Sequence, residues 1–446
     1  MMTKEDNELL CRVGPGTPMG NLMRLYWVPA VLSEELPEPD GAPVRVRLLS
    51  EDLIAWRQTD GSIGLMQNAC PHRGASLFFG RNEENGLRCV YHGWKFDVEG
   101  ACVDMPNEPA ESNFKHKIKA TAYPTRERNG VVWTYMGPDA NPPGLPEFEW
   151  NMDEEHRPFL WMNYRECNWL QAIEGGIDTS HVNFLHRTLD DTLRSTAVNS
   201  GPSPRQQNDL FRFGRRDASP RLEIVDTDYG VLYTGVRQVD ETTEYHRIHP
   251  FIFPFHNMIG GGTEDDEVNY IGMVWTPVDD ENTLVLEYGY RPSKGWGKEE
   301  LEQLMRVRNP NGFLPPTTQP GSHWRFRANK TNDYMVDRDL QKTKLFFGVQ
   351  GNPAQDGAVQ ESMGPIYNRT QEHLGSADSM IIQVRRRLLN AVKALRDRGE
   401  LPPGVNNPAM YRIRPVGAVL PKDADWAKET VERRKAWYVK GQGVTR

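Results

Sequence analysis

The N-terminal part of the chain carries short segments in which apolar residues alternate with polar ones or follow one another directly. Such segments are typical of β-strands. They run from Trp27 to about Pro138, with Asp60-Gly61 and Glu99-Gly100 as turns between them. The clearest strand-like segments are residues 44–49, 53–56 and 131–136. This pattern predicts a β-rich domain.

A proline-rich stretch, Asn141-Pro-Pro-Gly-Leu-Pro146, interrupts this pattern and indicates a domain boundary. We expect an N-terminal segment over residues 1–24, the β-rich domain over residues 25–140 and a second domain over residues 141–446. A chain of 446 residues is too long for one ordinary core, which agrees with this division.

The second domain mixes two hydrophobic periods. Residues 168–185 have helical spacing, with Leu170, Ile173, Ile177 and Phe184 as expected core positions. Strand-like segments follow at residues 221–225, 231–234, 271–275 and 283–288. Residues 379–398 predict a long amphipathic helix whose expected apolar residues are Ile381, Ile382, Val384, Leu388, Leu389, Val392 and Leu395. The predicted architecture is therefore an all-β domain followed by a larger α+β domain.

Composition narrows the possible functions. The formal net charge of −8 argues against nucleic-acid binding, which requires a basic surface. No run approaches the ~20 apolar residues that cross a membrane, and the polar N-terminus does not resemble a secretory signal. Five scattered cysteines favour a reducing, cytoplasmic location.

Two Cys-His pairs form the most informative motif. Cys70-Pro-His72 is followed, after sixteen residues, by Cys89-Val-Tyr-His92. A Rieske [2Fe–2S] cluster needs this donor set, with two Cys on one iron and two His on the other. The alternative is a structural zinc site, whose usual spacing pairs Cys with Cys and His with His. Because Cys and His alternate here, the iron–sulfur interpretation fits better.

A second group of possible ligands lies in the second domain, where Glu174, Asp178, His181 and His186 fall within thirteen residues. Two histidines and a more distant carboxylate form the facial triad of mononuclear Fe(II) oxygenases. On an ideal helix His181 and His186 would be separated by about 140°, so the helix must end or distort for both to face one iron. Asp178 is placed to contact the other ring nitrogen of His181.

These motifs together resemble the Rieske non-haem iron aromatic-ring oxygenases. The resemblance rests on Cys70-Pro-His-Arg-Gly-Ala75, Tyr91-His-Gly-Trp-Lys-Phe-Asp97 and the Glu174-to-His186 segment, and it covers most of the chain in the expected order. Three further segments of the sequence are similar to the phthalate 4,5-dioxygenase-like branch of the oxygenase α subunits. They are residues 12–20, 79–85 and 360–366. This branch implies a helix-grip (START-like) second domain.

The resemblance also implies roles for particular residues. The third iron ligand is an Asp late in the chain, and Asp356 matches it; Asp378 is the alternative, although it also suits the N-cap of the following helix. Glu174 and Asn168 align near the iron without an assured ligand role. In the family's head-to-tail trimers an Asp bridges a Rieske histidine to an iron ligand of the next subunit. Asp178 would so link His72 or His92 to His181.

The implied function is that of a terminal oxygenase with one [2Fe–2S] cluster and one Fe(II) per chain, which uses O₂ to dihydroxylate an aromatic carboxylate. Arg247 is the expected carboxylate-binding residue and Arg205 the second candidate. No reductase motif is present, so a separate reductase, with or without a ferredoxin, would supply electrons from NADH or NADPH. The expected assembly is a homotrimer or stacked homohexamer.

Two alternatives remain open at this point. One is a Rieske O-demethylase of lignin-derived methoxybenzoates, which would use every residue named above. The other is a non-enzymatic Rieske electron carrier or redox sensor, which would need the cluster but not the set of His181, His186 and Asp356.

Overall fold

The first domain is built from three small antiparallel sheets. The computed structural model describes residues 2–189, 217–260, 269–292, 294–439 and 443–444. In the first domain the sheets have the strand orders β1-β10-β9, β2-β3-β4 and β5-β6-β7-β8. The strands are β1 (Trp27–Leu32), β2 (Val44–Leu48), β3 (Glu51–Arg57), β4 (Ile63–Gln67), β5 (Arg81–Asn82), β6 (Leu87–Arg88), β7 (Lys95–Phe96), β8 (Cys102–Asp104), β9 (Thr125–Arg128) and β10 (Val131–Tyr135). The predicted strands at 44–49, 53–56 and 131–136 are thus confirmed.

A long antiparallel sheet forms the frame of the second domain. Its order is β11-β17-β16-β15-β14-β13-β12, with β18 paired to β14. The strands are β11 (Phe159–Arg165), β12 (Arg221–Thr227), β13 (Gly230–Gln238), β14 (Thr243–Ile252), β15 (His256–Gly260), β16 (Tyr270–Pro277), β17 (Thr283–Tyr290) and β18 (Val416–Pro421). A small hairpin follows, made of β19 (Tyr438–Val439) and β20 (Gly443–Val444).

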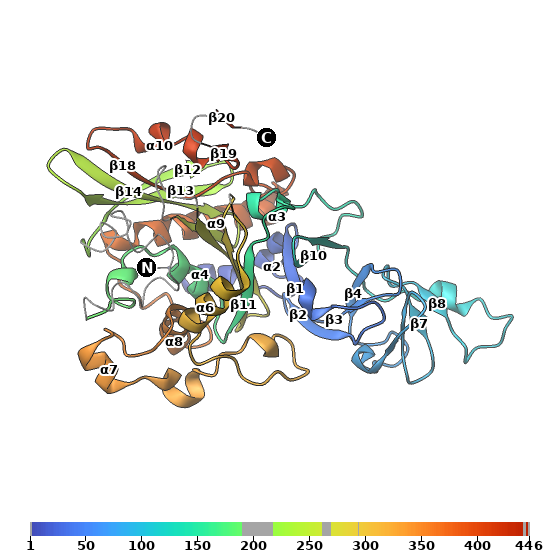
Figure 1. Cartoon of the computed structure of the whole chain (residues 1–446). Coiled ribbons are helices and arrows are strands. Elements are labelled where there is room, and N and C mark those ends of the chain that lie inside the picture. The colour runs from blue at the N-terminus through green and yellow to red at the C-terminus, as the bar shows by residue number, and fades with distance from the viewer. Residues whose placement is uncertain (1, 190–216, 261–268, 293, 440–442, 445–446) are drawn as a thin grey trace.

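The second domain also contains the helices α3 (Glu149–Met152), α4 (Trp169–Ile177), α6 (Lys298–Arg308), α7 (Arg338–Thr343), α8 (Asn352–Ser362), α9 (Ser379–Arg398) and α10 (Trp426–Glu429), which Figure 1 shows around the sheet. Of these, α4, α8 and α9 contact strands of the sheet. The N-terminal helices α1 (Lys4–Cys11) and α2 (Pro18–Met23) contact α9, and α1 also contacts α4. The segment before residue 25 therefore packs on the second domain. Within the described residues, no helix has both the length and the apolar character that crossing a lipid bilayer requires.

Two helical predictions need correction. Helix α9 has the predicted bounds, but Ile382 is 47% exposed, because it lies two residues, about 200°, from the buried Val384. The predicted helix over residues 168–185 ends at Ile177, and Phe184, expected in the core, is 46% exposed. The helix ends there because Asp178 is extended and its carboxylate accepts a hydrogen bond from the Ser180 amide at 2.7 Å.

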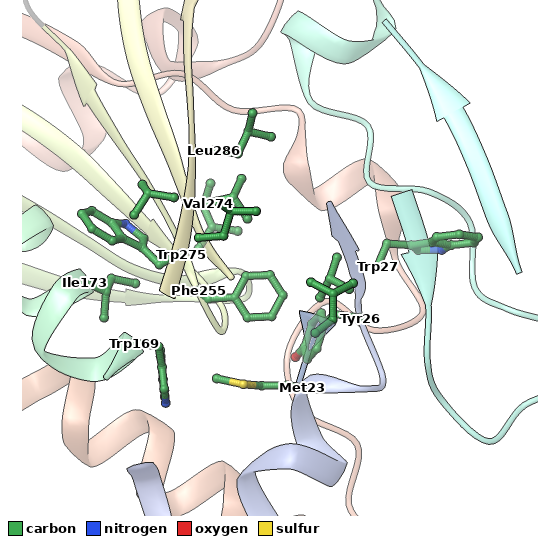
Figure 2. Packing of buried hydrophobic residues seen from close by; sticks show 14 of the residues in the cluster. Met23, Tyr26, Trp27, Trp169, Ile173, Phe255, Val274, Trp275 and Leu286 are labelled. Atoms are coloured by element: carbon green, nitrogen blue, oxygen red, sulfur yellow. The ribbon is translucent and has the colours of Figure 1, made fainter. Parts of the chain in front are cut away.

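The main core joins the two domains and fixes α4 on the sheet. Trp169 and Ile173 of α4 are fully buried, with Ile173 beside Trp275 of β16 (Figure 2). Tyr26 meets Phe255 edge-to-face with ring centroids 6.2 Å apart. A Cβ on Gly176 would lie 2.4 Å from the Trp275 ring, so α4 approaches the sheet more closely than a larger residue would allow. The end of α4, where the predicted iron ligands begin, is therefore held rigidly.

Candidate functional site

Two hairpin loops of the first domain carry the predicted cluster ligands. The first, after β4, holds Cys70 and His72, and the second, between β6 and β7, holds Cys89 and His92. Both loops turn in the same way: the Gly74 amide donates to Cys70 O at 2.9 Å and the Gly93 amide to Cys89 O at 3.0 Å. Both glycines have positive φ, +75° and +79°, which residues with side chains rarely adopt.

The donor groups of these loops come together in two pairs, one of imidazoles and one of thiols. The ring centroids of His72 and His92 lie 4.5 Å apart, and His92 Nδ1 is shielded from solvent without a hydrogen-bond partner in the described part of the chain. Cys70 and Cys89 are buried free thiols. Burial, with the Cys89 thiol nearby, raises the pKa of Cys70 to about 11. Two bare thiolates would be unfavourable here, so a cationic centre that takes both sulfurs fits this donor set.

The second candidate site lies where α4 and α8 meet. His181 and His186 follow the end of α4, and Asp356 projects from α8. His181 Nε2 lies 3.2 Å from His186 Nε2 and 3.7 Å from Asp356 Oδ1, and the distance from His186 Nε2 to Asp356 Oδ1 is 3.2 Å. The three side chains offer one ligand atom each, all within 4.8 Å of one another, so that they could hold a metal ion. Two His and one carboxylate are the donors that suit non-haem Fe(II).

The charge state of this group also suits a metal. Burial opposes ionisation of Asp356, but His186 and His181 beside it outweigh burial and lower the pKa of the carboxyl to about 2. Asp356 is therefore a carboxylate at neutral pH, as a metal ligand must be.

Each histidine has a different neighbour at its other ring nitrogen. Asp178 Oδ2 lies 3.6 Å from His181 Nδ1, which is longer than a direct hydrogen bond. His186 Nδ1 instead lies 2.7 Å from Oε1 of Gln355. The sequence predicted Asp178 as the neighbour of His181. It did not predict Gln355 as the neighbour of His186, because nothing in the local pattern distinguishes Gln355 from other glutamines.

The remaining ligand candidates are engaged elsewhere. The Glu174 carboxylate accepts hydrogen bonds from Arg369 and Arg385, at 2.9 and 2.6 Å. Asn168 is the N-cap of α4, and its amide donates to the carbonyl oxygens of Cys11 and Asp280. Asp378 stands at the N-cap of α9, although its carboxylate accepts from the Gly375 amide at 2.7 Å rather than from an amide of α9. None of the three belongs to the group around His181.

One face of the large sheet lies against the loop that follows α4. Arg237 of β13 points Nη2 at Thr179 O, 3.4 Å away, and a Cβ on Gly235 would lie 3.4 Å from the Thr179 hydroxyl. Arg247 of β14 is directly opposite Gly235 in the antiparallel register, so its side chain shares this face. Arg237 was not predicted from the sequence, where it is a single Arg within the mostly apolar run of β13.

The arginines of this face lie without an acidic partner among the residues that the structure describes. Within the described residues, neither Arg237 nor Arg247 forms an ion pair with a carboxylate; Arg247 Nε donates to Gly260 O at 3.0 Å. Arg237 is 1% exposed, and burial together with the neighbouring charge of Arg247 lowers its pKa to about 10. An anionic group placed here would relieve this positive charge. Arg205, the second candidate, lies outside the described residues.

Known sequences and families match both domains. The family described as "Rieske [2Fe-2S] domain" matches residues 26–123, and that described as "LigXa C-terminal domain like" matches residues 134–444. The 3-chlorobenzoate-3,4-dioxygenase oxygenase subunit of Comamonas testosteroni is 40% identical, covering 96% of this chain and 97% of that protein.

Two further relatives extend this similarity. The phthalate 4,5-dioxygenase oxygenase subunit of Pseudomonas putida is 38% identical, over 96% of this chain and 94% of the relative. The 5,5'-dehydrodivanillate O-demethylase oxygenase subunit of a Sphingobium species is 31% identical, over 98% and 91%. All three similarities span both candidate metal centres.

Proposed function

This chain belongs to the Rieske aromatic-ring oxygenases, as the oxygenase (α) subunit, and from that premise we propose that it dihydroxylates the ring of an aromatic carboxylate, with phthalate-type acids as the substrate class. The observation that carries the proposal is the convergence of His181, His186 and Asp356 beside a sheet face on which Arg247 has no acidic partner among the described residues. A metal ligand set and an anion-binding group would then share one site.

The substrate class follows from charge and similarity together. Two of the relatives are named for 3-chlorobenzoate and phthalate, both of which are aromatic carboxylates. In this chain, Arg247 would bind the carboxylate through its guanidinium, which pairs well with planar anions. Arg237, buried beside it, would add positive charge to the same region. The substrate would thus be oriented with its ring toward the iron ligands.

The residues have separate tasks in this proposal. Cys70, Cys89, His72 and His92 would hold the [2Fe–2S] cluster, and His181, His186 and Asp356 would hold Fe(II), which when bound supplies open coordination positions for O₂. Asp178 would face His181 and, across a subunit boundary, contact His72 or His92. Buried apolar residues around α4 would exclude water from the site.

Such a link between subunits fits the layout of one chain. In Figure 1 the strands β7 and β8 beside the cluster loops stand at the far right, whereas α4 and α8 lie left of centre. The two candidate metal sites of one chain are therefore well separated, and a head-to-tail trimer, alone or as a stacked hexamer, would bring sites of neighbouring chains together. Electrons would come from a separate reductase, with NADH or NADPH as their source.

Turnover with ¹⁸O₂ tests the proposed reaction. The reduced, iron-loaded protein would be supplied with a donor reductase and a panel of phthalates, chlorobenzoates and methoxybenzoates, and products would be analysed by mass spectrometry. We expect a product with two labelled oxygens on the ring. Oxygen consumption that yields only peroxide with every aromatic acid would contradict the substrate proposal.

O-demethylation is the second candidate, and the 31% identical O-demethylase subunit favours it. The same experiment separates the two reactions, since demethylation of a methoxybenzoate releases formaldehyde and leaves a phenol. A simple electron carrier would instead bind about two irons per chain, the cluster alone, rather than about three.

A further inference from the structure

Gln355 is the residue directly before Asp356, in the first turns of α8, and its side chain is 4% exposed. Its Oε1 lies 2.7 Å from His186 Nδ1, and its Nε2 donates to Val349 O, also at 2.7 Å. Both polar ends of the amide are therefore occupied inside the protein.

These two contacts determine which proton His186 carries. The carbonyl of Val349 can only accept, so the NH₂ group of Gln355 must face it and Oε1 must face the imidazole. Oε1 in turn can only accept, so that His186 Nδ1 carries the hydrogen. The lone pair of a neutral His186 is then on Nε2, the atom that lies 3.2 Å from both His181 Nε2 and Asp356 Oδ1.

The two histidines of the site thus have different partners at the ring nitrogen that faces away from the metal ligand group. His181 has the carboxylate of Asp178 at 3.6 Å, whereas His186 has a neutral amide in direct hydrogen-bond contact. A carboxylate partner makes an imidazole a stronger electron donor to a metal, while an amide orients the ring without adding charge. The contact that Asp178 would make across the subunit boundary therefore concerns His181 alone.

We propose that Gln355 is a positioning residue of the mononuclear iron site, which holds His186 as the Nδ1–H tautomer with Nε2 directed at the metal. This inference rests on the proposed function, because it takes His181, His186 and Asp356 as the iron ligands. Gln355 acts through His186 and has no ligand role of its own.

Binding of Fe(II) to the otherwise intact protein, in competition with a chelator, tests the proposal without using turnover. Gln355→Leu removes the acceptor, and we expect a roughly 10- to 100-fold weaker affinity for Fe(II). Gln355→Glu keeps an acceptor at the same reach but loses the donor to Val349 O, so its affinity for Fe(II) should fall less than that of Gln355→Leu. Gln360→Leu is the matched control, since Gln360 lies on the same helix, is 3% exposed and has no hydrogen bond to an iron ligand.

A spectroscopic signature distinguishes positioning from packing. With nitric oxide as the probe, the EPR signal of the Fe(II) adduct should change in Gln355→Glu, where a carboxylate replaces the amide at His186, and stay unchanged in Gln360→Leu. The absorbance of the Rieske cluster verifies that the first domain of each variant is folded, and circular dichroism verifies the second domain.

Two results would overturn the inference: wild-type affinity in Gln355→Leu together with an unaltered signal in Gln355→Glu, or an equal loss of affinity in Gln360→Leu. If the wild-type protein itself bound no Fe(II) outside the cluster, both the proposed function and this inference would fail. If the wild-type protein bound Fe(II) and one of the two results above were found, only the inference about Gln355 would fail.

Discussion

Arg369 lies with its guanidinium against the carboxylate of Glu174, and its Nη2 donates to Oε2 at 2.9 Å in a part of the core that excludes solvent. Arg385 of α9 donates to the other oxygen at 2.6 Å, and Arg369 Nη1 reaches Asn7 of α1 at 3.0 Å. Glu174 thus ties α4 to α9 and to the N-terminal helix. Glu174 is close to the predicted iron ligands in the sequence, but its role is to link these helices.

Replacing Glu174 with Gln should destabilise the second domain in a pH-dependent way. Burial alone would raise the pKa of Glu174, but Arg369 and Arg385 outweigh it and hold the pKa below its ordinary value of 4.5. The stabilisation is therefore present above pH 4.5 and is lost as the pH falls through the lower folded-state pKa. At neutral pH we expect a loss of about 3–5 kcal/mol in the free energy of unfolding, because Arg369 is left buried without a carboxylate and Arg385 keeps only that of Glu372.

Denaturant unfolding at a series of pH values measures this effect. The difference between wild type and Glu174→Gln should shrink below pH 4.5. Asp397→Asn, which removes an exposed partner of Arg396, is the control and should change nothing measurable. A difference that stays constant from pH 7 to pH 3.5 would contradict the assignment of charge to Glu174.

Asp356→Ala should empty the mononuclear site and leave the cluster in place. We expect Fe(II) affinity at this site to fall by more than about 100-fold, since loss of an outer partner alone costs 10- to 100-fold. Iron analysis, with the cluster absorbance as an internal reference, measures both centres. The matched control is Asp378→Ala, because that carboxylate only caps a turn at Gly375. Full iron content in Asp356→Ala, or loss of iron in Asp378→Ala, would favour Asp378 over Asp356 as the third iron ligand.

The sequence predicted those parts of the site whose residues are close together in the chain. The cluster donors lie on two short loops, and each Cys is followed four residues later by a glycine that permits the turn. Asp356 could be named only through resemblance to a family, because tertiary packing of α8 against α4 brings it to His186. Gln355 could not be predicted at all, since its role depends on that same packing.

The error at Phe184 has a local physical cause. Apolar spacing continues past Ile177, but the carboxylate of Asp178 binds the Ser180 amide and competes with the helix for it. A helix prediction from hydrophobic periodicity does not take such a side-chain hydrogen bond into account. The same early helix end is what allows His181 and His186 to face each other, with ring centroids 5.0 Å apart.

Asp178→Asn should block turnover without emptying either metal centre. The substitution keeps the shape of the side chain but removes the charge that faces His181, and we expect activity to fall by at least about 10- to 100-fold, the cost of losing such a partner. Product formation is measured alongside iron content. Asp240→Asn is the control, because Asp240 makes a similar turn contact with the Thr242 amide on the β13–β14 connection. Activity near the wild-type rate in Asp178→Asn would exclude the bridging role.

Arg247→Leu should weaken the binding of aromatic acids. Loss of a charge-assisted hydrogen bond of about 1.5–3 kcal/mol corresponds to a roughly 10- to 100-fold higher Kd. Isothermal titration with benzoate, phthalate and 3-chlorobenzoate measures it. Arg221→Leu serves as the control, because Arg221 is a surface residue of β12 already paired with Glu223 and Glu244. Equal affinity of Arg247→Leu and wild type for these acids would show that the carboxylate does not bind at β14.

Val90→Asp should prevent the first domain from docking on a neighbouring chain. Val90 and Tyr91 lie between the ligands Cys89 and His92 and are 57% and 55% exposed. They place two large side chains on the surface beside the cluster ligands, where the proposed neighbouring chain would cover them. A charge at this position would have to be desolvated on docking, so we expect dissociation of the proposed trimer, with loss of turnover and an unchanged cluster spectrum. Leu401→Asp, also 55% exposed but distant in the chain from the cluster loops, is the control. Light scattering after size-exclusion chromatography measures the mass, and an intact, active trimer of Val90→Asp would show that this surface is not the docking face.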